Sequence, residues 1–264
     1  MTTENITNTK SLAEHLASAW DKGEGVQPVT VLNPDLTVDD AYQVQLHTIE
    51  ESVKGGQRIT GKKIGLTSKA MQDMLGVGEP DYGHLLDQMH VENGGVISSS
   101  QVLQPKVEGE IAFILKNDLV GPNVTTMDVL AATEAVLPAL EIVDSRIKDW
   151  KITLADTVAD NASSGLYVLG DKPVKLTDID VKQIGMTLYK NNELQNTGVG
   201  AAALGDPAKC VAWLANKLST YGITLKAGEV ILSGALSAAI EGEAGDTFYA
   251  KFSELGEVRV SFVK

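Results

Sequence analysis

The feature that most constrains the fold is a long succession of short segments rich in β-branched and aromatic residues, which starts at residue 57. Segments of this kind, separated by Gly, Pro, Asn and Asp, are typical of β-strands. Two helical patterns interrupt them, one near Thr125 and one from Asp206 to a stop at Gly222. Runs of strands with few helices favour an α+β fold over a doubly wound sheet. We expect strands at 58–66, 107–115, 139–143, 165–169, 184–190, 229–233, 246–252 and 257–263, and a hairpin turn at 190–193.

Residues 1–56 have a helical pattern instead. Ser11 and Glu14 have the spacing of a capping box, as do Thr37 and Asp40, and each pair precedes apolar residues at helical spacing. The same spacing links Thr125 to Asp128 in the later helix, so these pairs predict where helices begin. The chain therefore divides into a helical N-terminal region, 1–56, and a β-rich domain, 57–264.

Three glutamates lie in apolar, strand-like segments: Glu108 and Glu110 in 107–115, and Glu141 in 137–143. Carboxylates are seldom buried unless they are paired or bound to a cation. Residues two apart in a strand share a face, so Glu108 and Glu110 point the same way and repel each other unless a proton or a cation lies between them. Three oxygen ligands without nearby His or Cys suit Mg²⁺ or Mn²⁺ better than Zn²⁺.

An edge strand whose acids face water is the alternative interpretation of the same pattern. The sequence cannot separate the two, because it does not show whether Glu141 meets the other two glutamates. The pattern alone leaves both interpretations open.

Two adjacent lysines, Lys62 and Lys63, lie in the strand-like segment 61–67. Strand alternation sends them to opposite faces, so one can be solvated while the other points inward. An inward lysine beside a metal could hold an anionic substrate or move a proton. Two surface lysines on an edge strand are the alternative.

Two loop-like segments carry further candidates. Asp81 lies in 78–83, a turn by composition, where it could cap the turn or act as a catalytic acid. The polar segment 156–164 reads as a loop in which ordinary turn chemistry is the alternative to binding, and its possible hydrogen-bonding groups are Asn161, Ser163 and Ser164.

Charge and composition exclude several classes of protein. The formal net charge is -13 and Lys and Arg form no cluster, which argues against a nucleic-acid partner. No run of 18 apolar residues and no signal-peptide pattern is present, so the sequence predicts a cytoplasmic protein with no membrane partner. Phosphate-loop and dinucleotide-binding motifs are missing, and the single cysteine, Cys210, excludes an internal disulfide.

A set of motifs, taken in order along the chain, resembles the hydratase/decarboxylase branch of the fumarylacetoacetate-hydrolase-like superfamily, from the meta-cleavage degradation of aromatic compounds. The resemblance covers nearly the whole chain and implies a mixed, mostly antiparallel rolled β-sheet core with a helical N-terminal lead-in. The motifs are 61–67 (GKKIGLT), 80–83 (PDYG), 107–111 (VEGEI), 137–141 (LPALE), 144–147 (DSRI), 157–163 (TVADNAS) and 230–236 (VILSGAL).

The resemblance also implies an activity and a site. The activity is hydration of 2-hydroxypenta-2,4-dienoate to 4-hydroxy-2-oxopentanoate, by an enzyme whose domain 57–264 is catalytic. It implies that three glutamates bind Mg²⁺ or Mn²⁺, which chelates the substrate's carboxylate and 2-oxygen, that Lys63 and Asp81 are catalytic, and that Lys63 and Ser163 bind the small anionic 2-hydroxydienoate or 2-oxoacid. The glutamates are Glu108, Glu110 and Glu141.

Three alternatives accompany that implication. The sister enzyme, 4-oxalocrotonate decarboxylase, shares the metal carboxylates and the lysine but typically lacks an acid at the position of Asp81, which favours the hydratase. A carbon–carbon hydrolase would need a His/Glu pair, and no His in the helical region is placed for it. A non-enzymatic protein that binds a metal and a 2-oxoacid is the third. The resemblance further implies a homo-oligomer that forms a complex with a sister pathway enzyme in some systems.

Overall fold

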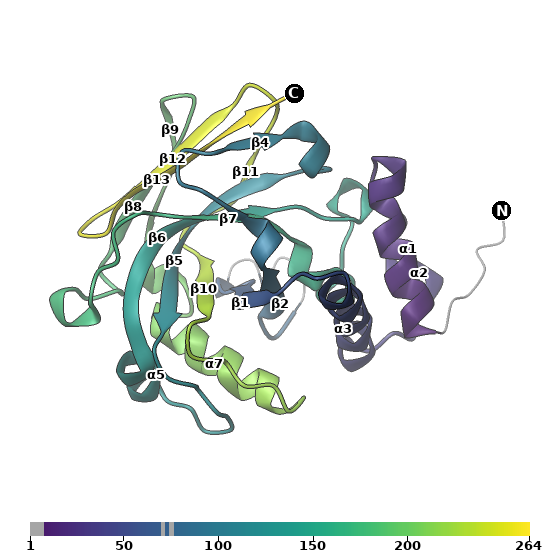
Figure 1. Cartoon of the computed structure of the whole chain (residues 1–264), viewed down its shortest axis with the longest axis horizontal. Helices are drawn as coiled ribbons and strands as arrows, with labels where there is room; N and C mark the ends of the chain where they lie inside the picture. Colours follow the sequence, from purple (N-terminus) through teal and green to yellow (C-terminus); the bar gives the residue numbers. More distant parts are fainter. Residues whose placement is uncertain (1–7, 70–71, 74–76) are drawn as a thin grey trace.

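A computed structural model of the chain describes residues 8–69, 72–73 and 77–264. In these residues three helices lead into two β-sheets, and further helices lie between strands (Figure 1). The helices are α1 (Thr9–Lys22), α2 (Val29–Leu32), α3 (Val38–Lys54), α5 (Thr126–Ala132), α6 (Leu154–Ala159) and α7 (Pro207–Ser219). The strands are β1 (Ile59–Gly65), β2 (Asp81–Leu86), β3 (His90–Val91), β4 (Val96–Ser98), β5 (Lys106–Leu115), β6 (Thr133–Val143), β7 (Ser164–Leu169), β8 (Gly185–Lys190), β9 (Glu193–Val199), β10 (Val230–Ala235), β11 (Ile240–Glu241), β12 (Thr247–Phe252) and β13 (Gly256–Val263).

The strands form a larger sheet in the order β2-β1-β10-β5-β6-β7-β3, with β11 beside β5, and a smaller sheet in the order β4-β13-β12-β8-β9. Neighbouring strands are antiparallel except for the pairs β1–β10, β3–β7 and β4–β13. The long strands β5 and β6 lie side by side near the centre of the larger sheet, and β6 curves strongly along its length (Figure 1). This confirms the expected α+β fold with a mostly antiparallel, rolled sheet.

All eight strands expected from the sequence are present, although β6 begins at Thr133 rather than at 139. The expected hairpin turn joins β8 to β9 through Asn191 and Asn192, whose φ angles are 54° and 67°. Asn tolerates positive φ, which is why the sequence showed this turn. Strands β2, β3, β4, β9 and β11 were not expected, because they are short or carry turn-forming residues and depend on distant partners for their hydrogen bonds.

The capping boxes of Thr37 and Thr125 are confirmed at the starts of α3 and α5, and Asp206 caps α7. The box expected at Ser11 is wrong. Helix α1 begins earlier, because the side chain of Asn8 accepts a hydrogen bond from the backbone N–H of Lys10 at 2.9 Å. Residues 1–7 of the expected helical region lie outside the described residues.

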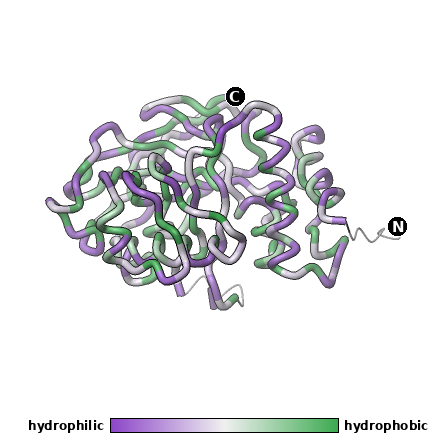
Figure 2. The backbone as a smooth tube through the Cα atoms, turned by 60° about the horizontal axis from the view of Figure 1, so that its bottom comes forward, coloured by the Kyte–Doolittle hydropathy of each residue, from purple (hydrophilic) through white to green (hydrophobic). Residues whose placement is uncertain are grey.

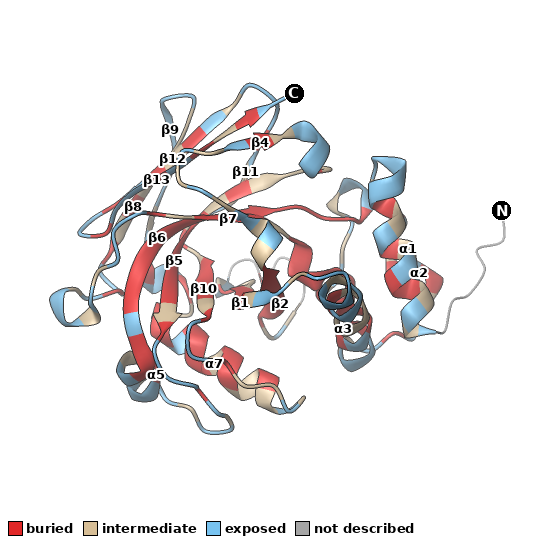
Figure 3. Cartoon of the chain, viewed as in Figure 1, coloured by how far each residue is buried: buried red, intermediate tan, exposed pale blue. Residues whose placement is uncertain are grey.

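One hydrophobic core joins the helical region to both sheets. It contains Leu12 of α1, Tyr42 of α3, Phe113 of β5 and Phe248 of β12. Strands β5, β6 and β10 are mostly buried (Figure 3). The helices of the N-terminal region therefore pack as part of the core that supports the sheets.

Hydrophobic and hydrophilic stretches alternate along the backbone (Figure 2). Within the described residues, no helix has the length and apolar character needed to cross a membrane.

The segment 156–164, expected as a loop, begins inside helix α6, whose capping box joins Thr153 to Asp156. Asp156 is fully buried and accepts four hydrogen bonds at 2.8 to 2.9 Å, from the backbone and hydroxyl of Thr30 and from those of Thr153. It thus links α2 to α6.

We expect Asp156→Ala to lower the free energy of unfolding by about 2–4 kcal/mol, because it leaves buried N–H and O–H donors unpaired. Urea denaturation measures the loss. Asp40→Ala is the matched control, since it removes the exposed acid of the α3 capping box at a cost of about 1 kcal/mol or less. Equal losses in the two variants would contradict a structural role for the buried carboxylate.

Candidate metal centre and active site

The register between β5 and β6 brings the three predicted glutamates together. Glu108 lies directly opposite Glu141, and Glu110 lies opposite Ala139. Because Glu108 and Glu110 share one face of β5, a carboxylate oxygen from each of the three residues lies within 4.8 Å of the others. Glu141 therefore meets the other two, which the sequence alone left open.

The carboxylate cluster of Glu108, Glu110 and Glu141 brings three acidic groups together in a poorly solvated place. Glu110 is 0% exposed and Glu141 is 1% exposed, whereas Glu108 is partly exposed. Burial, followed by the charge of Glu141, raises the pKa of Glu110 well above its ordinary value and that of Glu108 to about 8. Burial also raises the pKa of Glu141, although the neighbouring charge of Lys63 opposes this.

The hydrogen bonding of the carboxylate cluster fits a bound cation. Oε2 of Glu110 accepts a hydrogen bond from the backbone N–H of Gly234 at 2.8 Å. Oε1 of Glu110 and both oxygens of Glu141 are buried and accept none from the described residues. Buried carboxylate oxygens without donors are costly, and a hard divalent cation such as Mg²⁺ would satisfy them. The donor set therefore fits such a metal.

Lys63 of β1 lies at the edge of the carboxylate cluster. Its Nζ is 3.4 Å from Oε1 of Glu141 and 3.8 Å from Oδ1 of Asp81, and it donates a hydrogen bond to the carbonyl of Ala162 at 2.9 Å. Burial disfavours the charged amine, but the surrounding carboxylates outweigh it and hold the pKa of Lys63 above its ordinary value. Lys63 is therefore a buried ammonium group beside the candidate metal centre.

Asp81 is buried, and the expectation that it lies in a turn is wrong, since it is the first residue of β2 and pairs with Gly65 of β1. Turn-forming neighbours hid this strand in the sequence. Oδ2 of Asp81 accepts a hydrogen bond from the hydroxyl of Thr157 at 2.9 Å, and its buried Oδ1 accepts none from the described residues. A Cβ at Gly65 would collide with Oδ1, so glycine there leaves room for the carboxylate beside Lys63.

Lys62 is buried as well, contrary to the expectation that one of the two lysines is solvated. Its ammonium pairs with Glu229, just before β10, on the face of β1 opposite to Lys63, and is 3% exposed. No sequence signal identified Glu229. Both lysines of β1 thus have buried carboxylate partners.

Ser163 is buried in the Asn161–Ser163 turn, which follows α6 and contains the carbonyl bonded by Lys63. Its Oγ has no hydrogen-bond partner among the described residues. The turn therefore places a free hydroxyl one residue from the Lys63 contact. The roles of Ser163, Lys63 and Asp81 stay predictions.

Divalent cations should stabilise the fold, because they would relieve the repulsion between the three clustered glutamates. At a Mg²⁺ concentration about 100 times Kd, binding contributes about 2.7 kcal/mol, so we expect Tm to rise by several degrees. Thermal unfolding followed by circular dichroism, with Mg²⁺ or with EDTA, measures this. An identical rise with NaCl of equal ionic strength would argue against a specific cation site.

Known proteins resemble the chain over most of its length. Residues 69–263 match the family described as fumarylacetoacetate (FAA) hydrolase C-terminal. A 2-hydroxypent-2,4-dienoate hydratase of Pseudomonas putida is 54% identical over 213 residues, 80% of this chain and 96% of the relative. A 2-hydroxyhexa-2,4-dienoate hydratase of Comamonas testosteroni is 47% identical over 253 residues, 95% and 96% of the two chains. The solved structure of 4-oxalocrotonate decarboxylase from Pseudomonas putida G7, complexed with magnesium and adipate, matches with a TM-score of 0.95 and 37% identity over 98% of this chain and 100% of that one.

Proposed function

Because the chain belongs to the fumarylacetoacetate hydrolase family, we propose that it is a metal-dependent hydro-lyase that converts 2-hydroxypenta-2,4-dienoate to 4-hydroxy-2-oxopentanoate in the meta-cleavage degradation of aromatic compounds. The observation that carries the proposal is the position of Lys63 within 4 Å of both Glu141 and Asp81, at the edge of the carboxylate cluster. The hydratase names of the relatives support the same activity.

Glu108, Glu110 and Glu141 would hold the metal, for which we propose Mg²⁺ or Mn²⁺. When bound, the cation would stabilise negative charge on the 2-oxygen of the substrate. Three buried oxygens of Glu110 and Glu141 accept no hydrogen bond from the described residues, which supports this assignment, and decarboxylase structures solved with magnesium or calcium agree with a divalent ion.

Lys63 and Asp81 would move the protons. The dienol must first gain a proton at C5 and lose its hydroxyl proton, which gives 2-oxopent-3-enoate, and water then adds at C4 while C3 gains a proton. The ammonium of Lys63 would bind the anionic substrate and donate a proton, and Oδ1 of Asp81, which accepts no hydrogen bond from the described residues and lies 3.8 Å from Nζ of Lys63, would accept a proton from water. Ser163 would donate a hydrogen bond from its free hydroxyl to the substrate.

Decarboxylation of 4-oxalocrotonate is the second candidate, because the decarboxylase structure has a TM-score of 0.95 with this chain. It would use the same stabilised enolate, with carbon dioxide leaving instead of water adding. The acid at Asp81, which decarboxylases of the branch typically lack, favours hydration.

The deciding experiment supplies the purified chain with 2-hydroxypenta-2,4-dienoate or with 4-oxalocrotonate, each with Mg²⁺ and with EDTA. We expect Mg²⁺-dependent loss of the dienoate and formation of 4-hydroxy-2-oxopentanoate, identified by NMR. Release of carbon dioxide from 4-oxalocrotonate alone would show a decarboxylase. Binding of Mg²⁺ and oxalate without turnover of either substrate would show a binding protein.

Substrate length and assembly extend the proposal. The Comamonas relative is named for a dienoate one carbon longer, and one methylene usually changes specificity by only about 1–3 kcal/mol, so we expect turnover of both dienoates.

We also propose a homo-oligomer that works in the cytoplasm with a sister enzyme of the same pathway. Light scattering after size-exclusion chromatography tests the assembly.

A further inference from the structure

The Asn161–Ser163 turn has a backbone conformation that its side chains disfavour. Asn161, Ala162 and Ser163 have φ angles of 52°, 51° and 52°, so three successive non-glycine residues are left-handed. Each such residue costs about 1–2 kcal/mol, and Asn tolerates the conformation better than Ala. A strained turn of this kind persists only when its surroundings hold it.

A buried arginine holds both ends of the left-handed turn. Arg146 donates from its guanidinium to the carbonyl of Ser164 at 2.6 Å and pairs with the carboxylate of Asp160. Asp160 in turn accepts hydrogen bonds from the backbone N–H of Arg146 and from the hydroxyl of Ser145. This contact fixes the residues before and after the turn but none inside it.

Asn161 holds the turn from the inside, against β2. Its Oδ1 accepts a hydrogen bond from the backbone N–H of His84 at 2.7 Å, and its Nδ2 donates one to the carbonyl of His84 at 2.9 Å. The approach is close, because a Cβ at Gly83 would lie 2.5 Å from the carbonyl oxygen of Asn161. One buried amide therefore satisfies both backbone groups of a β2 residue and sets the distance between the turn and the strand.

Strand β2 and the turn meet at Lys63. Gly83, next to the residue bonded by Asn161, pairs with Lys63 across β1 and β2. The carbonyl of Ala162, next to Asn161 on the other side, accepts the hydrogen bond of Lys63 Nζ at 2.9 Å. Movement of the turn away from β2 would withdraw that acceptor and leave the amine to the carboxylates at 3.4 and 3.8 Å.

We propose that Asn161 is a positioning residue for the reaction: through its two hydrogen bonds to His84 it sets the carbonyl that orients Lys63 and the hydroxyl of Ser163. The role in the reaction rests on the proposed function. The competing explanation is that Asn stands at 161 only because it tolerates a left-handed backbone.

Asn161→Gly separates the two explanations, because glycine accepts positive φ readily but has no amide. We expect kcat per bound Mn²⁺ to fall about 30- to 100-fold, as for other small misplacements of a catalytic group, while the Kd for Mn²⁺ changes less than about threefold. Asn192→Gly is the matched control, since Asn192 is also left-handed but is exposed in the β8–β9 hairpin. An Asn161→Gly protein with wild-type kcat would overturn the proposal.

Asn161→Asp covers the case in which the glycine variant fails to fold. Aspartate tolerates a left-handed backbone and keeps the acceptor for the N–H of His84 but loses the donor to its carbonyl, so we expect a loss of kcat between those of wild type and glycine. Wild-type kcat in a folded Asn161→Asp protein would count against the role of the donor and hence against the proposal.

The affinity of the Mn²⁺-loaded protein for oxalate tests the position of Lys63 without requiring turnover. We expect either folded variant to bind oxalate about tenfold more weakly than wild type, with the Mn²⁺ affinity retained. If wild type does not hydrate the dienoate, the proposed function is wrong. If the variants bind oxalate as tightly as wild type does, Asn161 does not position Lys63.

Discussion

Replacing Glu110 by Gln should lower kcat/KM by about a thousandfold or more while the chain stays folded. Glu110 is 0% exposed, and its Oε1, which accepts no hydrogen bond from the described residues, would face the metal. Gln keeps the volume and can still accept the hydrogen bond from Gly234, but it removes the charge. Loss of a cation that supplies several kcal/mol of transition-state stabilisation corresponds to a decrease of this size.

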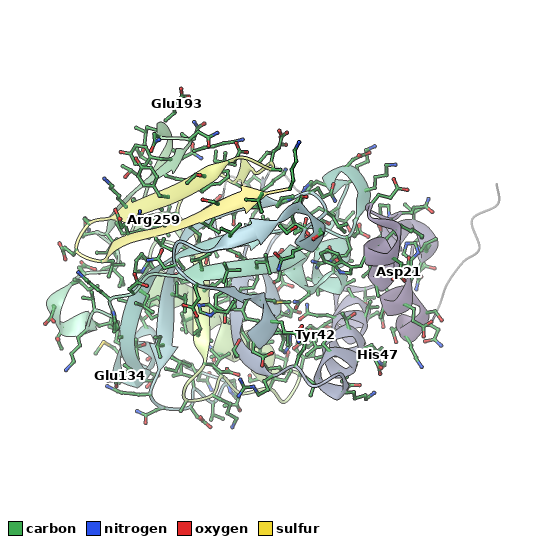
Figure 4. The ribbon with its side chains drawn as sticks, turned by 45° about the horizontal axis from the view of Figure 1, so that its top comes forward. Asp21, Tyr42, His47, Glu134, Glu193 and Arg259 are labelled. Atoms are coloured by element: carbon green, nitrogen blue, oxygen red, sulfur yellow. The ribbon has the colours of Figure 1, made fainter. Side chains whose placement is uncertain are left out.

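The same substitution should leave the metal-free protein as stable as wild type or more stable, because it relieves the repulsion with Glu141 and Glu108. Calorimetric titration with Mn²⁺, steady-state kinetics and urea denaturation test the three parts of this expectation. Glu134→Gln is the control, since it removes the same charge from an exposed position on β6 (Figure 4). Full activity of Glu110→Gln at low Mg²⁺ would count against the metal centre.

Replacing Asp81 by Asn should lower kcat for hydration about 10²- to 10⁴-fold, the range typical of a lost general acid or base. Asn can still accept the hydrogen bond from Thr157, so the strand and the turn beside it should keep their positions. It cannot take a proton from water. Because Asp81 is not part of the carboxylate cluster, we expect the Mn²⁺ affinity to change less than about threefold.

The two readouts, kcat and the Kd for Mn²⁺, separate three roles of Asp81. Loss of kcat alone supports proton transfer, equal loss of both would place Asp81 in the coordination shell of the metal, and loss of neither would leave it a structural residue. Asp21→Asn, at an exposed position near the end of α1, is the control for the change of charge (Figure 4).

The parts of the site that sequence could predict depend on local geometry. Alternation along β5 places Glu108 and Glu110 on one face whatever the rest of the chain does. The capping boxes of Thr37 and Thr125 are equally local, because each is made within four residues. The capping box predicted at Ser11 is wrong because another capping residue, Asn8, lies only one turn earlier and begins helix α1.

The parts that sequence could not predict depend on pairing between distant segments. Glu141 joins the cluster only through the register of β5 and β6. Asp81 enters a strand because β1 supplies its hydrogen bonds, and a segment that looks like a turn gives no sign of that partner. The sequence shows Asn161 only as a possible turn residue, because its hydrogen bonds to His84 join residues 77 positions apart.

The lysine pair of β1 has a consequence for folding. A strand that slips by one residue against its neighbours exchanges its two faces. If β1 slipped so that Gly61 took the place of Lys62, Glu229 would be buried without a cation, and if Ile64 took the place of Lys63, Glu141 would lose its ammonium neighbour. Misalignment in either direction is therefore penalised by an unpaired buried charge. The doublet therefore ties the alignment of β1 to two acids on opposite faces of the sheet, and a slip in either direction leaves one of these two acids without a cation.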